Sequence, residues 1–155
     1  MSFSFLESII DQNVIEFNLE NHYDLICLLL KADETLFNVA MEKCENKNSL
    51  LKNGETFLTN LFKEGYGIET IDSIVDKKIF DANVINKFGE SPLVLACQNM
   101  MVSTVTKIVQ KYPLFPTHKD QAFKTALNIK NKISQSVWFQ YMILLLTHCL
   151  ESIIG

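Results

Sequence analysis

The sequence predicts a single all-α domain built from successive helix–turn–helix units. Its 155 residues include only five glycines and three prolines, which disfavours an all-β fold with many tight turns. Apolar residues make up 48% of the chain and charged residues 21%, as expected for a folded globular domain. A pattern of turn, helix, link and helix recurs about every 35 residues, so the chain accommodates one N-terminal helix and four units.

The first two elements come from the N-terminal third of the chain. Residues 1–12 are expected to form a capping helix, because apolar residues recur through them. A first unit follows at about residues 13–47. Its first helix is expected to begin near Tyr23, and its second helix carries Leu36 and Val39 on one face.

The clearest unit spans about residues 83–116. Gly89 permits the positive φ of a tight turn. Ser91 can cap the free amides of a helix start, and Pro92 suits the first helical position, where its missing N–H costs nothing. A second helix is expected to bury residues at helical spacing, namely Thr104, Val105, Ile108 and Val109.

The remaining units follow from shifting this pattern along the chain. A shift of 35 residues towards the N-terminus places Gly54 on Gly89 and Thr56 on Ser91, which defines a unit at about 48–82. A shift of 34 residues in the other direction defines a last unit at about 117–150. A turn is therefore expected before the last unit's first helix, with His118 exposed on it.

The third unit resembles the ankyrin repeat. Residues 91–96 read Ser-Pro-Leu-Val-Leu-Ala, which matches the T-P-L-H-x-A signature of that family at all but the histidine. The turn 83–89 is similar to the family's N-x-x-D-x-x-G turn, and Gly65-Tyr66 to its Gly–His pair. The resemblance covers about residues 13–150 and implies a short helical repeat solenoid with an N-terminal capping helix. Phe123 departs from it, since the family has a turn glycine there.

The resemblance also implies a function, because ankyrin repeats bind partner proteins through turn tips and the exposed ends of first helices. The corresponding residues are Lys52, Asn53, Lys63, Lys87, Phe88, Glu90, Gln98, Asn99 and Gln121. Phe88 is either an exposed interface anchor or a ring that packs on the adjacent turn, and both alternatives stay open. The expected function is a protein–protein interaction module.

Several other functions are disfavoured by composition. The formal net charge is −4 and all 14 basic residues are lysine, which argues against nucleic-acid binding. The three histidines and four cysteines lack metal-ligand spacing, so no metal or cofactor is expected. Nothing singles out a nucleophile or a phosphate loop, so we do not expect an enzyme. The scattered cysteines are typical of reduced thiols in a cytoplasmic protein.

The C-terminal segment offers a second interaction surface. Residues 133–150 carry no formal charge but contain polar side chains, so a packed helix is expected and a membrane span is not. Its apolar residues Trp138, Phe139 and Met142 could form a homodimer contact. An unrelated α-helical bundle that is an obligate oligomer through this helix therefore remains the alternative.

The source is also suggested by composition. Lysine, asparagine and isoleucine are abundant and arginine is absent, as expected from an AT-rich genome. Such genomes occur in viruses and intracellular microbes, so a binder directed at a host protein in the host cytoplasm is a reasonable expectation.

Overall fold

The computed structural model describes residues 4–12, 16–132, 140, 143–144 and 146–148. Within these residues all regular secondary structure is α-helical, so the predicted all-α class is confirmed. The helices are α1 (Ser4–Asp11), α2 (Tyr23–Ala32), α3 (Glu34–Glu42), α4 (Phe57–Lys63), α5 (Ile68–Lys77), α6 (Pro92–Gln98), α7 (Val102–Lys111) and α8 (Pro116–Lys132).

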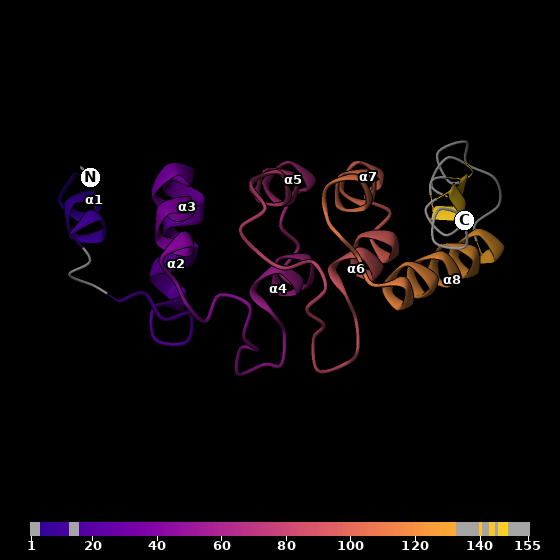
Figure 1. The fold of residues 1–155 in the computed structure, drawn as a ribbon, viewed down its shortest axis with the longest axis horizontal. Helices are drawn as coiled ribbons and strands as arrows, with labels where there is room; N and C mark the ends of the chain where they lie inside the picture. Colours follow the sequence, from indigo (N-terminus) through magenta and orange to yellow (C-terminus); the bar gives the residue numbers. More distant parts are fainter. Residues whose placement is uncertain (1–3, 13–15, 133–139, 141–142, 145, 149–155) are drawn as a thin grey trace.

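The helices are arranged in two rows (Figure 1). One row contains α2, α4 and α6, and the other contains α3, α5 and α7, with α1 and α8 at opposite ends. Within the rows α4 packs against α6 and α5 against α7, while α2–α3 and α6–α7 contacts join the rows. The connections before α4 and α6 project away from the row of α3, α5 and α7 (Figure 1).

The helix starts follow from local capping chemistry. The Thr56 hydroxyl accepts a hydrogen bond from the Thr59 N–H over 3.0 Å, and the Thr59 hydroxyl accepts one from the Thr56 N–H over 2.8 Å. The Ser91 hydroxyl accepts from the Val94 N–H over 3.3 Å, and Pro92 is the first residue of α6. The predicted cap at Ser91 is therefore confirmed.

The ends of α4 and α6 share one backbone geometry. Gly65, just past α4, has φ of +76°, and Tyr66 donates its N–H to the Leu61 carbonyl over 3.0 Å. Met100 takes the same place after α6, with φ of +57°, and Met101 donates to the Ala96 carbonyl over 2.9 Å. Both are Schellman ends, but the second forces a methionine into the left-handed region that glycine adopts freely.

Aromatic rings connect successive helices in the core. The ring centroids of Phe37 and Phe57 are 5.8 Å apart, and Phe57 stacks on Phe80 with centroids 5.3 Å apart. All three side chains are at most 3% exposed. Such aromatic pairs add about 0.5–1.5 kcal/mol each to the free energy of unfolding, beyond area burial.

The turn predicted before the last unit is wrong. Residues 116–132 form the single helix α8 instead of a turn followed by a short helix. His118, Ala122 and Ala126 are spaced four residues apart and are all buried, which gives α8 a continuous small face that packs on α6. Pro116 supplies a good first helical residue, and no glycine interrupts the segment.

The expected exposure of His118 is also wrong, because α8 turns this residue inward. Its side chain is 8% exposed, and its ring centroid lies 5.5 Å from that of Phe115. Burial lowers the pKa of His118, and the Asp81 carboxylate partly opposes that effect. We therefore expect the imidazole to be neutral at physiological pH.

The residues expected to form an oligomer contact, Trp138, Phe139 and Met142, lie outside the described residues. Most of the uncharged segment 133–150 lies outside them as well. Among the helices that the structure describes, none has the length and hydropathy needed to cross a bilayer.

Replacing Met100 with glycine should stabilise the protein. A methionine in the left-handed region costs about 1–2 kcal/mol of stability, which glycine would relieve. Glycine also makes the unfolded chain more flexible, which offsets about 0.4–1 kcal/mol of that gain. We expect the free energy of unfolding, measured by urea denaturation, to rise by about 0.5–1 kcal/mol.

The matched control is Gln98→Gly, two residues earlier at the exposed end of α6. A glycine inside the helix should lower the free energy of unfolding by up to about 1 kcal/mol. Equal destabilisation by both substitutions would contradict the strained geometry at Met100.

Candidate functional site

The site is organised around two turns with the same hydrogen-bond pattern, which we name the first tip (residues 51–55) and the second tip (86–90). In each, the first residue donates its N–H to the carbonyl of the fifth, over 2.7 Å in the first tip and 3.0 Å in the second. The fourth residue of each is a glycine, with φ of +84° and +79° respectively. The positive φ predicted for Gly89 is therefore confirmed.

The two tips are in direct contact. The Lys87 N–H donates to the Gly54 carbonyl over 2.8 Å. The aliphatic stem of Lys87 lies over Gly54, so closely that a Cβ on that glycine would fall 2.0 Å from the lysine Cδ. The Asn86 amide donates to the Glu55 carboxylate over 2.9 Å. Side-chain and backbone contacts together fix how the tips lie against each other.

Asn86 determines the shape of the second tip. Its side chain is 3% exposed, and its Oδ1 accepts the N–H groups of Phe88 at 3.0 Å and Glu90 at 2.9 Å. Asn86 belongs to the turn 83–89 predicted from the sequence, but it was not predicted as a site residue. Since Asn86 fixes the backbone of two tip residues, its role in the site is positioning.

Glu90 contacts two other residues predicted to bind a partner, Lys63 and Gln98. Its carboxylate accepts hydrogen bonds from Lys63 Nζ at 3.0 Å, Gln98 Nε2 at 3.3 Å and the Asn86 amide at 3.0 Å. Burial opposes ionisation of Glu90, but these hydrogen bonds and the Lys63 charge hold its pKa below the ordinary value. Glu90 therefore stays ionised and holds the end of α4 against the second tip.

Phe88 lies at the surface of this cluster. Its side chain is 63% exposed, the second-highest exposed aromatic fraction after Phe5 among the described residues. Lys87 Nζ is 5.0 Å from the ring centroid and Lys63 Nζ is 5.9 Å from it. Cation–π attraction to two lysines restricts the ring while leaving most of it accessible.

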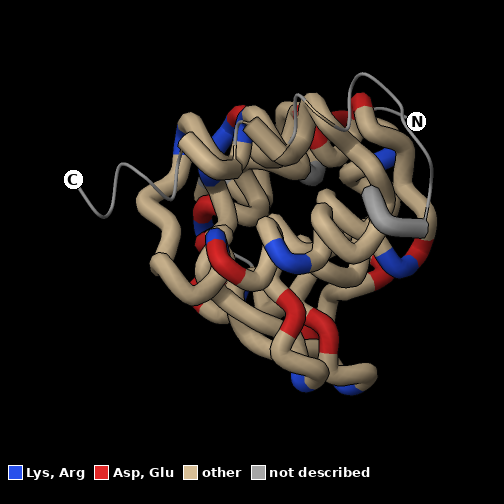
Figure 2. The backbone as a smooth tube through the Cα atoms, turned by 90° about the vertical axis from the view of Figure 1, so that its right-hand side faces the viewer, with Lys and Arg blue, Asp and Glu red and all other residues tan. Residues whose placement is uncertain are grey.

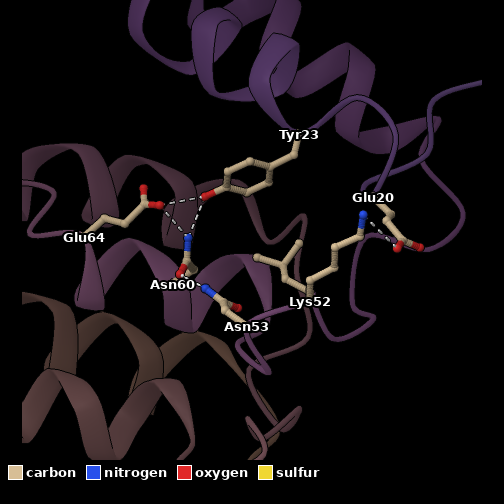
Figure 3. A pocket seen from close by; sticks show the side chains of 7 residues that line it. Glu20, Tyr23, Lys52, Asn53, Asn60 and Glu64 are labelled. Carbon is tan, nitrogen blue, oxygen red and sulfur yellow. Dashed lines mark hydrogen bonds and ion pairs between the residues drawn. The ribbon is translucent and has the colours of Figure 1, made fainter.

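The first tip borders a pocket of about 240 Å³ (Figure 3). Two predicted site residues, Lys52 and Asn53, contribute to its wall. The ring of Tyr23 from α2 points towards Asn60 from α4, and Lys52 lies apart from this pair (Figure 3). The full lining consists of Glu20, Tyr23, Leu51, Lys52, Asn53, Asn60 and Glu64.

A polar network forms one wall of this pocket. Asn53 Nδ2 donates to Asn60 Oδ1 over 2.9 Å, and the Asn60 amide donates to the Tyr23 hydroxyl and, over 2.9 Å, to Glu64 Oε1. The Tyr23 hydroxyl donates to the same Glu64 oxygen over 2.9 Å. Burial, the neighbouring Cys27 thiol and Glu64 all raise the pKa of Tyr23, so its hydroxyl stays protonated.

Sequence reasoning missed Tyr23 and Asn60 as site residues. The available signal was Asn60 itself, a polar residue within the mostly apolar segment 57–62. In the structure its side chain is only 3% exposed. A buried amide of this kind needs partners, and the structure supplies them from α2 and the first tip.

Two predicted site residues lie apart from these clusters. Asn99 follows α6, and its amide donates to the Leu95 carbonyl of that helix over 2.8 Å. Gln121 was expected on a turn tip, but it is an exposed residue within α8, so its predicted place is corrected. The remaining seven belong to the tips, the pocket or the Glu90 cluster.

The described thiols show no sign of activation. Cys27 is half-buried, and Cys44 and Cys97 are buried. Burial raises the pKa of all three, that of Cys97 to about 12, so the nucleophilic thiolate is scarce at neutral pH. Within the part of the chain that the structure describes, no cluster of three or more His, Cys, Asp or Glu residues could hold a metal ion.

Charges of both signs are interspersed along the described chain (Figure 2). In the site itself Lys63 pairs with Glu90, and Lys52 lies 3.7 Å from Glu20. Both lysines therefore lie close to a carboxylate within the site.

Comparisons with protein-family models, with curated proteins and with solved structures found no match to this chain.

Replacing Asn60 with alanine should destabilise the fold. The substitution removes a buried amide and leaves the Asn53 and Tyr23 side chains without their shared partner. We expect the free energy of unfolding, measured by urea denaturation, to fall by about 1–3 kcal/mol.

Asn99→Ala is the matched control, because Asn99 is an exposed asparagine at the end of the neighbouring helix. Its loss should change the free energy of unfolding by about 0.5 kcal/mol or less. Equal effects of the two substitutions would show that the Asn60 network contributes little.

Proposed function

We propose that this chain is a protein-binding module that contacts a partner protein through its two tips and the adjoining ends of α4 and α6. The observation that carries the proposal is the Glu90 cluster. It presents Phe88, an exposed aromatic ring held by two lysines, beside a pocket on the neighbouring tip. Exposed aromatic anchors with restrained conformations are typical of binding hot spots.

We also propose that the helix pairs α2–α3, α4–α5 and α6–α7 are ankyrin-like repeat units. The two tips share their backbone hydrogen bonds at equivalent positions. Asn48 and Asn83, 35 residues apart, also act alike: Asn48 Oδ1 accepts the Asp81 N–H and Asn83 Oδ1 accepts the Phe115 N–H, both at 2.9 Å. Equivalent residues making equivalent contacts support a repeat origin.

Substitution at the second tip tests the binding function. The tagged 155-residue chain and its Lys87→Ala, Phe88→Ala double variant would be used to capture partners from the same lysate. Because truncation of an aromatic hot spot costs about 2 kcal/mol or more, we expect recovery of the wild-type partner to fall at least tenfold.

The matched control is Lys77→Ala, Phe115→Ala, which removes another exposed lysine and a phenylalanine that is 57% exposed. This variant should recover the partner as the wild type does. Unchanged recovery by the tip variant would contradict the proposal. If the chain were then also a dimer at all concentrations, the obligate-oligomer alternative would be favoured.

A further inference from the structure

We propose that the pocket beside the first tip binds an arginine side chain of the partner protein. This inference rests on the proposed binding function and names the chemistry of one contact in it. It is carried by a positioned carboxylate, an apolar wall and a pocket of about 240 Å³.

The carboxylate of Glu64 is held from two helices. Its Oε1 accepts hydrogen bonds from the Tyr23 hydroxyl and the Asn60 amide, both over 2.9 Å. Since both donors use the same oxygen, the carboxylate retains acceptor capacity at Oε2. A side chain entering the pocket meets an acceptor whose orientation is already fixed, which lowers the entropic cost of binding.

The two tips differ at one position that lines the pocket. In the second tip Asn86 reaches back and donates to the Glu55 carboxylate of the first tip over 2.9 Å. The equivalent residue of the first tip is Leu51, which has no polar group to reach Glu20. Glu20 is instead exposed, 3.7 Å from an exposed Lys52, and such a surface pair is easily displaced.

Size and composition point to one cationic side chain. The pocket is smaller than the roughly 300–1,000 Å³ of typical small-molecule sites. The Tyr23 ring and Leu51 offer an apolar wall for an aliphatic stem, and two carboxylates against one lysine give the lining an acidic balance. A guanidinium fits better than an ammonium, because it stacks on aromatic rings and donates in a planar fork.

The test is a titration followed by ¹⁵N–¹H NMR with two probes, Nα-acetyl-arginine amide and its neutral counterpart Nα-acetyl-citrulline amide. We expect the arginine probe to shift the amide signals of Tyr23, Leu51 and Asn60 saturably. Its affinity should exceed that of the citrulline probe about fivefold, because only the arginine pairs with the carboxylates.

Glu64→Gln keeps the acceptor oxygen but removes the charge of the positioned carboxylate, so it should bring the arginine affinity at least twofold closer to the citrulline affinity, while Glu20 keeps part of the preference. Glu42→Gln, an exposed glutamate on α3, should leave the affinity unchanged. Thermal unfolding of both variants checks that they fold. Equal affinity for the two probes, non-saturating shifts, or indifference to Glu64→Gln would each overturn the proposal.

This result is separable from the proposed function. If the arginine probe does not bind but substitution of Lys87 and Phe88 still abolishes partner recovery, the arginine pocket is ruled out and the proposed binding function is supported. If the arginine probe binds but the Lys87 and Phe88 substitutions leave partner recovery unchanged, the arginine pocket is supported and partner binding through the second tip is contradicted.

Discussion

The arrangement of the two tips depends on the hydrogen bonds of one side chain, that of Asn86. Its amide makes four hydrogen bonds: it accepts the N–H groups of Phe88 and Glu90 and donates to the carboxylates of Glu55 and Glu90. These use the full hydrogen-bonding capacity of an asparagine side chain. One buried group thereby shapes the second tip, joins it to the first and orients Glu90 towards Lys63. Because Asn86 binds the Phe88 N–H, the backbone of the second tip places the Phe88 ring at the surface.

Contacts between neighbouring helices matter here because the helices are short. Helices α4 and α6 have seven residues each, and isolated helices of that length are unstable in water. Packing within the rows stabilises these helices through buried apolar surface and through polar contacts. For example, the Asp72 carboxylate on α5 accepts hydrogen bonds from Ser103 and Thr104 on α7, both at 2.5 Å. Each helix is therefore stabilised mainly by its neighbours.

The sequence was most informative where structure is decided locally. Gly89, Ser91 and Pro92 act through their own backbone and first helical turn, so their roles could be predicted. The turn predicted at the start of the last unit was wrong, because the buried face of His118, Ala122 and Ala126 made a continuous helix more favourable than a turn without glycine. The pocket was not predictable for a related reason: Tyr23, Asn60 and Glu64 meet only after α2 and α4 have packed, and no spacing along the chain records that contact.

The most direct measurement is the coupling energy between Glu55 and Asn86, obtained from a double-mutant cycle of Glu55→Ala and Asn86→Ala. Such a cycle cancels what each side chain does alone and retains the interaction between the tips. If this contact joins the tips as described, the free energies of unfolding will deviate from additivity by about 1 kcal/mol or more in favour of the intact pair. Additivity within about 0.3 kcal/mol would contradict the account, because the two tips would then be independent.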